Sequence, residues 1–137
     1  CAAVYVPAGI GSPIFDGLEN NIAQIIFGIP GVSGLEFGAG FNASRMIGSQ
    51  NNDEFYVDDR GYTVTKTNNH GGILGGISSG MPIKLNAAIK PAFTAKSKNT
   101  ESQINIDPCL VPKAVPCIEA AVNIALLSHM IDYPNFC

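Results

Sequence analysis

The segment best suited to chemistry is a glycine-rich stretch that follows His70. Five of the ten residues from 71 to 80 are glycine, which is more than core packing accounts for. Glycine tolerates positive φ and lets the backbone approach another group closely, and exposed backbone N–H groups bind anions. The stretch nevertheless contains neither G-x-x-x-x-G-K-[ST] nor G-x-G-x-x-G, so a conventional nucleotide-binding loop is disfavoured.

Four titratable residues are further candidates, each with a plainer alternative. His70 would need a partner to act as a general acid or base, and its sequence neighbours offer none, so a turn-capping role is favoured. Asp107 precedes a proline and is a candidate carboxylate, although Asp-Pro pairs often only open turns. Lys90, taken alone, is typical of an exposed lysine at a strand end. His129 falls in the last turn of a predicted helix, where the helix dipole favours a cation. For this residue a structural role is favoured over a catalytic one.

The elements that position these residues are predicted from spacing and from turn residues. A helix is expected to start at Ser12-Pro13 and to stop near Gly28, before Pro30. A last helix is expected to start near Pro116, after an irregular turn at 107–113. Strands are predicted over 3–6, 35–37, 62–65 and 83–89, the last with clear alternation.

The other segments are predicted as connections or left open. Residues 50–59 are expected to form a solvated polar loop, and residues 92–106 are also expected to be loop. Residues 41–47 fit a strand or a short helix equally well. Because helices and strands do not alternate as βαβ units, the sequence predicts an α+β fold in a single domain over residues 1–137.

Composition narrows the class of protein. Eight Lys and Arg against eleven Asp and Glu give a net charge of −3, which argues against a nucleic-acid partner. No apolar run is expected to reach the roughly 18 residues of a membrane helix. The four cysteines form no C-x-x-C pair, so we expect free thiols in a cytosolic protein and no metal site. The chain has no basic leader and no initiator Met, so we expect a processed product, a fragment or an edited version.

Five blocks of sequence carry a family resemblance, and the most specific is Asn-His-Gly-Gly-Ile-Leu-Gly-Gly-Ile-Ser-Ser-Gly at 69–80. The others lie at 7–16, at 34–41 with 48–53, at 89–91 and at 107–116. In content and order they resemble the carboxy-terminal half of chorismate synthase.

This resemblance implies a sandwich of helices and antiparallel sheet, present here in part. It implies a lyase that converts 5-enolpyruvylshikimate 3-phosphate to chorismate by 1,4-anti elimination of phosphate. The reaction belongs to the shikimate pathway of aromatic amino acid biosynthesis and requires reduced FMN without net redox change. The resemblance also implies a homotetramer, located in the cytoplasm or in a plastid, with no nucleic-acid or membrane partner.

The resemblance also assigns roles to particular residues. The flavin contacts of the family fall on Pro30, Gly31, Gly75, Lys90, Pro91, Ala92, Phe93 and Thr94. Asp107 matches the aspartate of the family's Gly-Arg-His-Asp-Pro motif and is the implied proton-relay group.

Several departures from the family pattern qualify these roles. Asn105 and Ile106 replace the Arg and His of that motif, and Lys113 replaces a usual Arg. The link from Thr94 to Asp107 is shorter than in relatives, and the amino-terminal half with its catalytic histidines and substrate arginines is absent. We therefore expect the 137 residues alone to be inactive. The alternatives are a decayed relative that binds only flavin or a partner, and a structural domain whose glycines serve packing.

Overall fold

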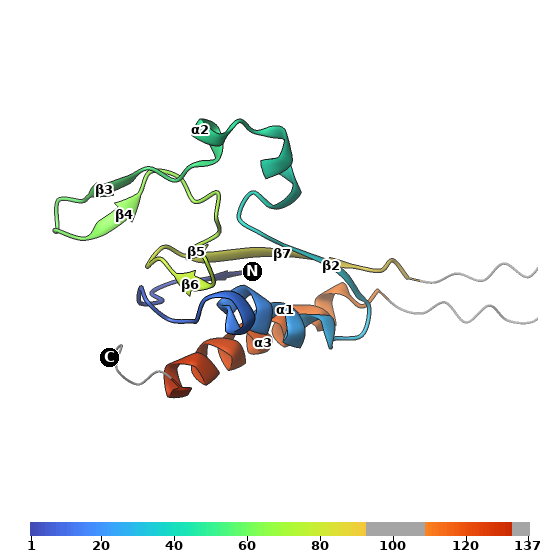
Figure 1. The fold of residues 1–137 in the computed structure, drawn as a ribbon. Helices are drawn as coiled ribbons and strands as arrows, with labels where there is room; N and C mark the ends of the chain where they lie inside the picture. The colour runs from blue at the N-terminus through green and yellow to red at the C-terminus, as the bar shows by residue number, and fades with distance from the viewer. Residues whose placement is uncertain (93–108, 133–137) are drawn as a thin grey trace, which may run out of the picture.

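The computed structural model describes residues 1–92 and 109–132, which form a small antiparallel sheet resting on two helices, with an arm projecting from the other side (Figure 1). The sheet has the order β1-β7-β2, from β1 (Ala2–Ala3), β7 (Ile83–Ile89) and β2 (Val32–Phe37). The helices are α1 (Leu18–Phe27) and α3 (Val111–Asp132). The predicted mixture of helices and antiparallel strands is present.

The central strand β7 is buried on one face only, as its alternating sequence predicts. Ile83 and Leu85 point into the core, whereas Lys84 and Asn86 between them are exposed. β2 pairs with β7 in antiparallel register from Val32 opposite Ile89 to Phe37 opposite Leu85. The predicted strands at 35–37 and 83–89 are thus confirmed, while the strand expected at 3–6 is limited to Ala2–Ala3.

The core is formed where the helices pack against each other and against the sheet. Leu18, Ile22 and Ile26 lie on one face of α1 and are fully buried. Burying each such side chain contributes roughly 1.5–3 kcal/mol. The facing side of α3 contributes a stripe of buried residues at helical spacing: Ala114, Ile118, Ala121, Val122, Ala125, Leu126 and His129.

The first helix begins later than its sequence suggests. Ser12-Pro13 is followed by a 3-10 turn, η1 (Ile14–Asp16), and α1 starts only after Gly17, whose backbone is extended. The N–H of Leu18 donates to the carbonyl of Gly76, 2.8 Å away, so a distant backbone group satisfies the helix start. The expected start at Ser12 was therefore wrong, whereas the expected end at Gly28 is confirmed.

The last helix begins earlier than predicted. α3 starts at Val111 and carries Pro116 inside its second turn, where we expected the helix to begin and an irregular turn to end at Lys113. Proline inside a helix lacks the N–H that would bond four residues back, but near the start this removes only one bond. The sequence signal was misread because proline is also common at the first helical position.

By length and composition alone, α3 is long and apolar enough to cross a membrane. The expectation that no segment would be long and apolar enough was therefore wrong. This alone is weak support for a membrane role, because a core helix of a soluble protein meets the same criterion. One face of α3 is in fact buried, and the helix packs against α1.

The arm comprises residues 40–70 and contains η2 (Gly40–Arg45), α2 (Gly48–Asn51), β3 (Phe55–Val57) and β4 (Thr63–Thr65) (Figure 1). β3 and β4 form a hairpin whose turn is held by Asp58, which accepts hydrogen bonds from the N–H groups of Arg60 and Tyr62. The segment 50–59 is thus not simply a loop. Residues 41–45 are helical, as part of η2, whereas Met46 and Ile47 have extended backbone. The glycine-rich stretch follows as a second hairpin of β5 (Ile73–Leu74) and β6 (Ile77–Ser78).

Candidate functional site

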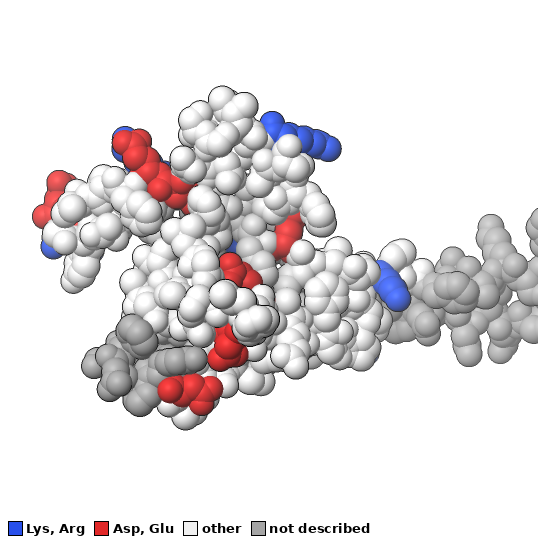
Figure 2. Space-filling view, in the orientation of Figure 1, with Lys and Arg blue, Asp and Glu red and all other residues white. Residues whose placement is uncertain are grey.

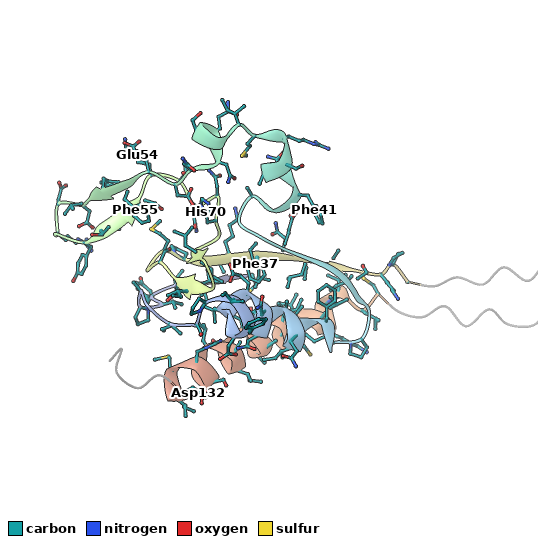
Figure 3. All side chains as sticks on the ribbon, viewed as in Figure 1. Phe37, Phe41, Glu54, Phe55, His70 and Asp132 are labelled. Atoms are coloured by element: carbon teal, nitrogen blue, oxygen red, sulfur yellow. The ribbon has the colours of Figure 1, made fainter. Side chains whose placement is uncertain are left out.

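A cavity of about 740 Å³ lies where the arm meets the glycine-rich stretch, and His70 lies beside it together with Glu54 and Phe55 (Figure 3). The side chain of Asp53 is only 5% exposed here. Its Oδ1 accepts hydrogen bonds from the Thr67 hydroxyl and the Asn69 N–H, and its Oδ2 accepts from the N–H and ring Nδ1 of His70. One carboxylate therefore anchors three residues of the loop that leads into the glycines.

These hydrogen bonds control the charge of Asp53. Burial raises the pKa of its carboxyl, but the donors from Thr67, His70 and Asn69 outweigh burial and lower the pKa to about 2. The carboxylate is thus ionised at neutral pH, and an Nδ1–H of His70 pointing at Oδ2 leaves Nε2 as the ring nitrogen free to exchange a proton. An imidazole oriented in this way can act as an acid or base toward a group in the cavity.

Sequence reasoning missed this pair. His70 was expected to lack a partner, and Asp53 was placed in a solvated loop, whereas the two side chains lie 2.8 Å apart. They are 17 residues apart in sequence and belong to no periodic pattern, so only the position of an acidic residue in a polar segment could have pointed to the contact.

Most of the glycines in the glycine-rich stretch lie against the backbone of other segments of the protein. A Cβ at Gly71 would meet the backbone of Gly38 and Lys84, one at Gly72 would meet Met81 and Pro82, and one at Gly76 would clash with the Ser12 carbonyl. The expected positive φ and close backbone approach are thus confirmed for these three glycines, but the backbone they approach is that of this chain, so packing does explain three of the five.

Gly75 differs from these three glycines. Its φ is +60°, and a Cβ there would meet no atom within 4 Å. It follows Leu74, which lines the large cavity. It is thus a predicted flavin contact whose backbone remains open to an incoming molecule.

A second group of predicted residues gathers at the other end of α1. The N–H of Lys90 donates to the carbonyl of Gly31, 2.7 Å away, where β7 ends and Pro30-Gly31 leaves α1. Gly31 has a φ of +88°, and a Cβ there would meet side-chain atoms of Leu110 at 3.3 Å and of Ile89 at 3.6 Å. Pro30, Lys90, Pro91 and Ala92 are exposed. This corner therefore presents an exposed lysine beside a glycine with positive φ.

The structure does not bring all predicted site residues together. The Gly75 hairpin bonds to the start of α1 through Gly76, whereas Gly31 and Lys90 follow its end. Ten helical residues separate the two places by about 15 Å. Phe93, Thr94 and Asp107, like the replaced motif residues Asn105 and Ile106, lie outside the described residues.

His129 serves to join the two helices. Its side chain is 1% exposed, and its Nε2 lies 2.6 Å from Nδ2 of Asn21 on α1. This contact ties α3 to α1 and supports the structural role favoured for this residue.

Comparison with known proteins decides the family. The model of the chorismate synthase family matches residues 1–131. The chain belongs to the chorismate synthase family. Chorismate synthase from Crocosphaera subtropica is 41% identical over 148 residues, and the chloroplastic chorismate synthase of Capnoides sempervirens is 43% identical over 142. A crystal structure of chorismate synthase superimposes on 95% of the chain with a TM-score of 0.77 and 32% identity, which also establishes the α+β fold.

The match covers the chain but only part of each relative. The alignments include 100% of this chain and 41% of the Crocosphaera protein, and 96% of this chain and 32% of the Capnoides protein. The solved chorismate synthase is covered over 34% of its length. The chain thus spans about two fifths or less of these chorismate synthases.

Proposed function

We propose that this chain is part of an enzyme that eliminates phosphate from 5-enolpyruvylshikimate 3-phosphate to form chorismate. Family membership over residues 1–131 is the observation that carries the proposal. It is supported by sequence blocks that include the glycine-rich stretch and the Ile89-Lys90-Pro91 corner. The proposed setting is the cytoplasm or a plastid, and the proposed assembly is a homotetramer.

The residues present fit parts of a reduced FMN site. The open backbone at Gly75 would admit a flat ring, because no atom lies within 4 Å of its missing Cβ. The exposed Lys90 would pair with an anionic group, and Pro30 and Gly31 would border it together with residues 91–94. When bound, reduced FMN would supply transient electron density while phosphate departs. Because Gly75 and Lys90 lie at opposite ends of α1, we propose that each holds a different part of the cofactor site.

Two carboxylates of this chain have proposed roles in proton handling. Asp107 is the proposed proton-relay group, on the strength of the family motif alone. Asp53 is not the proposed proton donor or acceptor itself, because its oxygens already accept four hydrogen bonds. Its proposed role is to orient His70. His70 would then hold or transfer a proton at Nε2.

We propose that the 137 residues alone are inactive. The substrate and the flavin phosphate are both anionic, and the chain has eight Lys and Arg residues in total. On the face shown in Figure 2, basic and acidic side chains are dispersed rather than gathered into a basic patch. The remaining parts of the substrate site would come from the portion of chorismate synthase that this chain does not match.

A chimera tests the proposal directly. The segment of the Crocosphaera protein that aligns with this chain would be replaced by residues 1–137. Phosphate release from 5-enolpyruvylshikimate 3-phosphate would be followed anaerobically with reduced FMN. We expect turnover by the chimera and none by the chain alone. A folded chimera that binds reduced FMN without releasing phosphate would instead establish the alternative, a decayed flavin-binding relative.

A matched pair of lysine variants tests the flavin corner. In the chimera, Lys90→Met removes the cation beside Gly31, whereas Lys84→Met removes another exposed lysine, from β7, the strand that Lys90 follows. Losing one charged contact should weaken reduced FMN binding about tenfold in Lys90→Met, measured by anaerobic titration. Equal affinities for the two variants would contradict the assignment of Lys90.

A further inference from the structure

A second hollow, of about 300 Å³, lies on the outer face of the sheet, where the arm begins. The outer face is the one opposite the buried side chains of β7, and it carries the exposed Asn86 and Ala88. Figure 3 shows Phe41, at the start of the arm, on this side of the sheet. The hollow shares no lining residue with the cavity beside Asp53 and His70, so it is a separate place on the molecule.

The floor of the hollow is made of small residues. Gly34 on β2 lies opposite Ala88 on β7, and a Cβ at Gly34 would stand 3.4 Å from that of Ala88. Larger side chains at these two positions would fill the space above the sheet. The floor therefore stays open, and Glu36, Asn86 and Phe41 supply the polar and aromatic groups of the hollow.

Within residues 1–92 and 109–132, Glu36 is the only charged side chain that lines the hollow. Its Oε1 accepts a hydrogen bond from Asn86 Nδ2 at 3.0 Å, and its Oε2 accepts one from the N–H of Phe41 at 3.2 Å. The bond from Asn86, and after it the bond from Phe41, lowers the pKa of the Glu36 carboxyl, so this group is ionised at neutral pH. A carboxylate oxygen has two lone pairs, so each oxygen can accept one further hydrogen bond.

The start of the arm brings an aromatic ring to this carboxylate. Gly40 has a φ of +53°, and a Cβ there would collide with the side chain of Glu36, so glycine lets the backbone turn around the carboxylate. Phe41 follows, and its ring lines the hollow while the residue remains 81% exposed. In the described part of the chain, no basic side chain lies within 4.0 Å of Glu36. An ionised carboxylate and an uncovered aromatic ring thus share one open space that holds no cation of the chain.

We propose that this hollow binds the guanidinium group of a small organic cation. A guanidinium is planar and donates two parallel hydrogen bonds, one to each oxygen of Glu36. The face of an aromatic ring such as that of Phe41 attracts a cation. The open floor at Gly34 and Ala88 leaves room for a planar group. This inference does not depend on the proposed elimination reaction, because the substrate of that reaction is anionic.

Butylguanidinium is the probe, and two compounds of similar size are its controls. Butylurea is planar but uncharged, and butylammonium is charged but not planar. Each would be titrated into the isotopically labelled chain while NMR follows the two donors to Glu36, the Phe41 N–H and the Asn86 side-chain amide. We expect butylguanidinium to shift both signals to saturation, and each control to bind about tenfold more weakly or less. Equal binding of either control, or no shift with butylguanidinium, would overturn the proposal.

A peptide separates a free guanidinium compound from an arginine side chain, because both carry the same group. Acetyl-Gly-Arg-Gly-amide would be titrated in the same way. A volume of about 300 Å³ is at the lower end for small-molecule sites, and flanking peptide backbone adds atoms that it would have to hold. We therefore expect the peptide to bind more weakly than butylguanidinium. Tighter binding of the peptide would overturn the assignment to a small molecule.

Two matched pairs of variants test the groups that carry the site. Glu36→Gln removes the charge at nearly constant size and should weaken butylguanidinium binding about tenfold, whereas Glu119→Gln on α3, outside the hollow, should leave it unchanged. Phe41→Leu should weaken binding about two- to fivefold through loss of the cation–π contact, and Phe15→Leu, which is also exposed, should have no effect. The phenylalanine pair keeps the test decisive if Glu36→Gln does not fold. Unchanged binding in Phe41→Leu, or in a folded Glu36→Gln, would contradict the site.

Discussion

In the sheet and its two helices, buried aliphatic side chains from β7, α1 and α3 pack against one another. In the arm, by contrast, Thr65 is the only residue among positions 40–70 that is buried as a whole. The arm instead uses Asp53, whose carboxylate holds Thr67, Asn69 and His70 in place. The first region is stabilised by area removed from water, and the second depends on a few charged hydrogen bonds. The catalytic cavity we propose lies on the second region, where a single protonation can change the local structure.

The largest expected effect is on the apolar region. Ile22→Ala removes a fully buried side chain from α1 and should lower the free energy of unfolding by about 2–5 kcal/mol. Ile124→Ala on α3, where the side chain is 57% exposed, should cost far less. Urea unfolding followed by circular dichroism would compare the two. Similar losses would mean that the α1–α3 contact is not the stabilising core.

The next effect concerns the glycine hairpin that joins the two regions. Gly76→Ala forces a Cβ against the Ser12 carbonyl and within 2.9 Å of Gly17, so it should destabilise the protein by well over the roughly 1–2 kcal/mol of a left-handed alanine. Gly75→Ala also has positive φ but meets no atom, so it should cost only that amount. Thermal unfolding of the two variants provides the measurement. A Gly75→Ala loss as large as that of Gly76→Ala would contradict the open environment of Gly75.

The outcome of sequence reasoning differs between the two regions for the same physical reason. The alternation of Ile83, Leu85 and Ala87 predicts β7 because a half-buried strand leaves a local period. The Asp53–His70 contact leaves none, since a carboxylate can accept hydrogen bonds from any loop that the fold brings near. The glycines were misread in a similar way. Position 76 must be glycine because a Cβ there would clash with the carbonyl of Ser12, 64 positions earlier in the chain, and no sequence pattern indicates such a contact. The roles of Lys90 and Asp107 rested on family resemblance rather than on pattern.

Acid should weaken the arm before it weakens the core. The pKa of Asp53 is lowered to about 2 in the folded protein from an ordinary value of 3.8, so its stabilisation is complete above pH 3.8 and is lost as the pH falls toward 2. The difference corresponds to about 2 kcal/mol. The protection of the Asn69 and His70 amides from exchange, relative to an unfolded chain at the same pH, should therefore fall over this range, while the protection of the Leu85 amide changes less. Asp53→Asn should show fast exchange at these two amides at every pH, and Asp59→Asn should behave as the wild type.

The smallest effect is expected from the other ion pair of the arm. Lys66 Nζ lies 2.8 Å from Glu54 Oε2, close to Asp53 in sequence, but both side chains are more than half exposed. Water screens such a pair, and measured contributions lie near 0–1 kcal/mol. Lys66→Ala should therefore leave exchange at Asn69 and His70 almost unchanged, and added salt should remove what difference remains. If Lys66→Ala instead released these amides as strongly as Asp53→Asn, the arm would be held by its surface charges and not by the buried carboxylate.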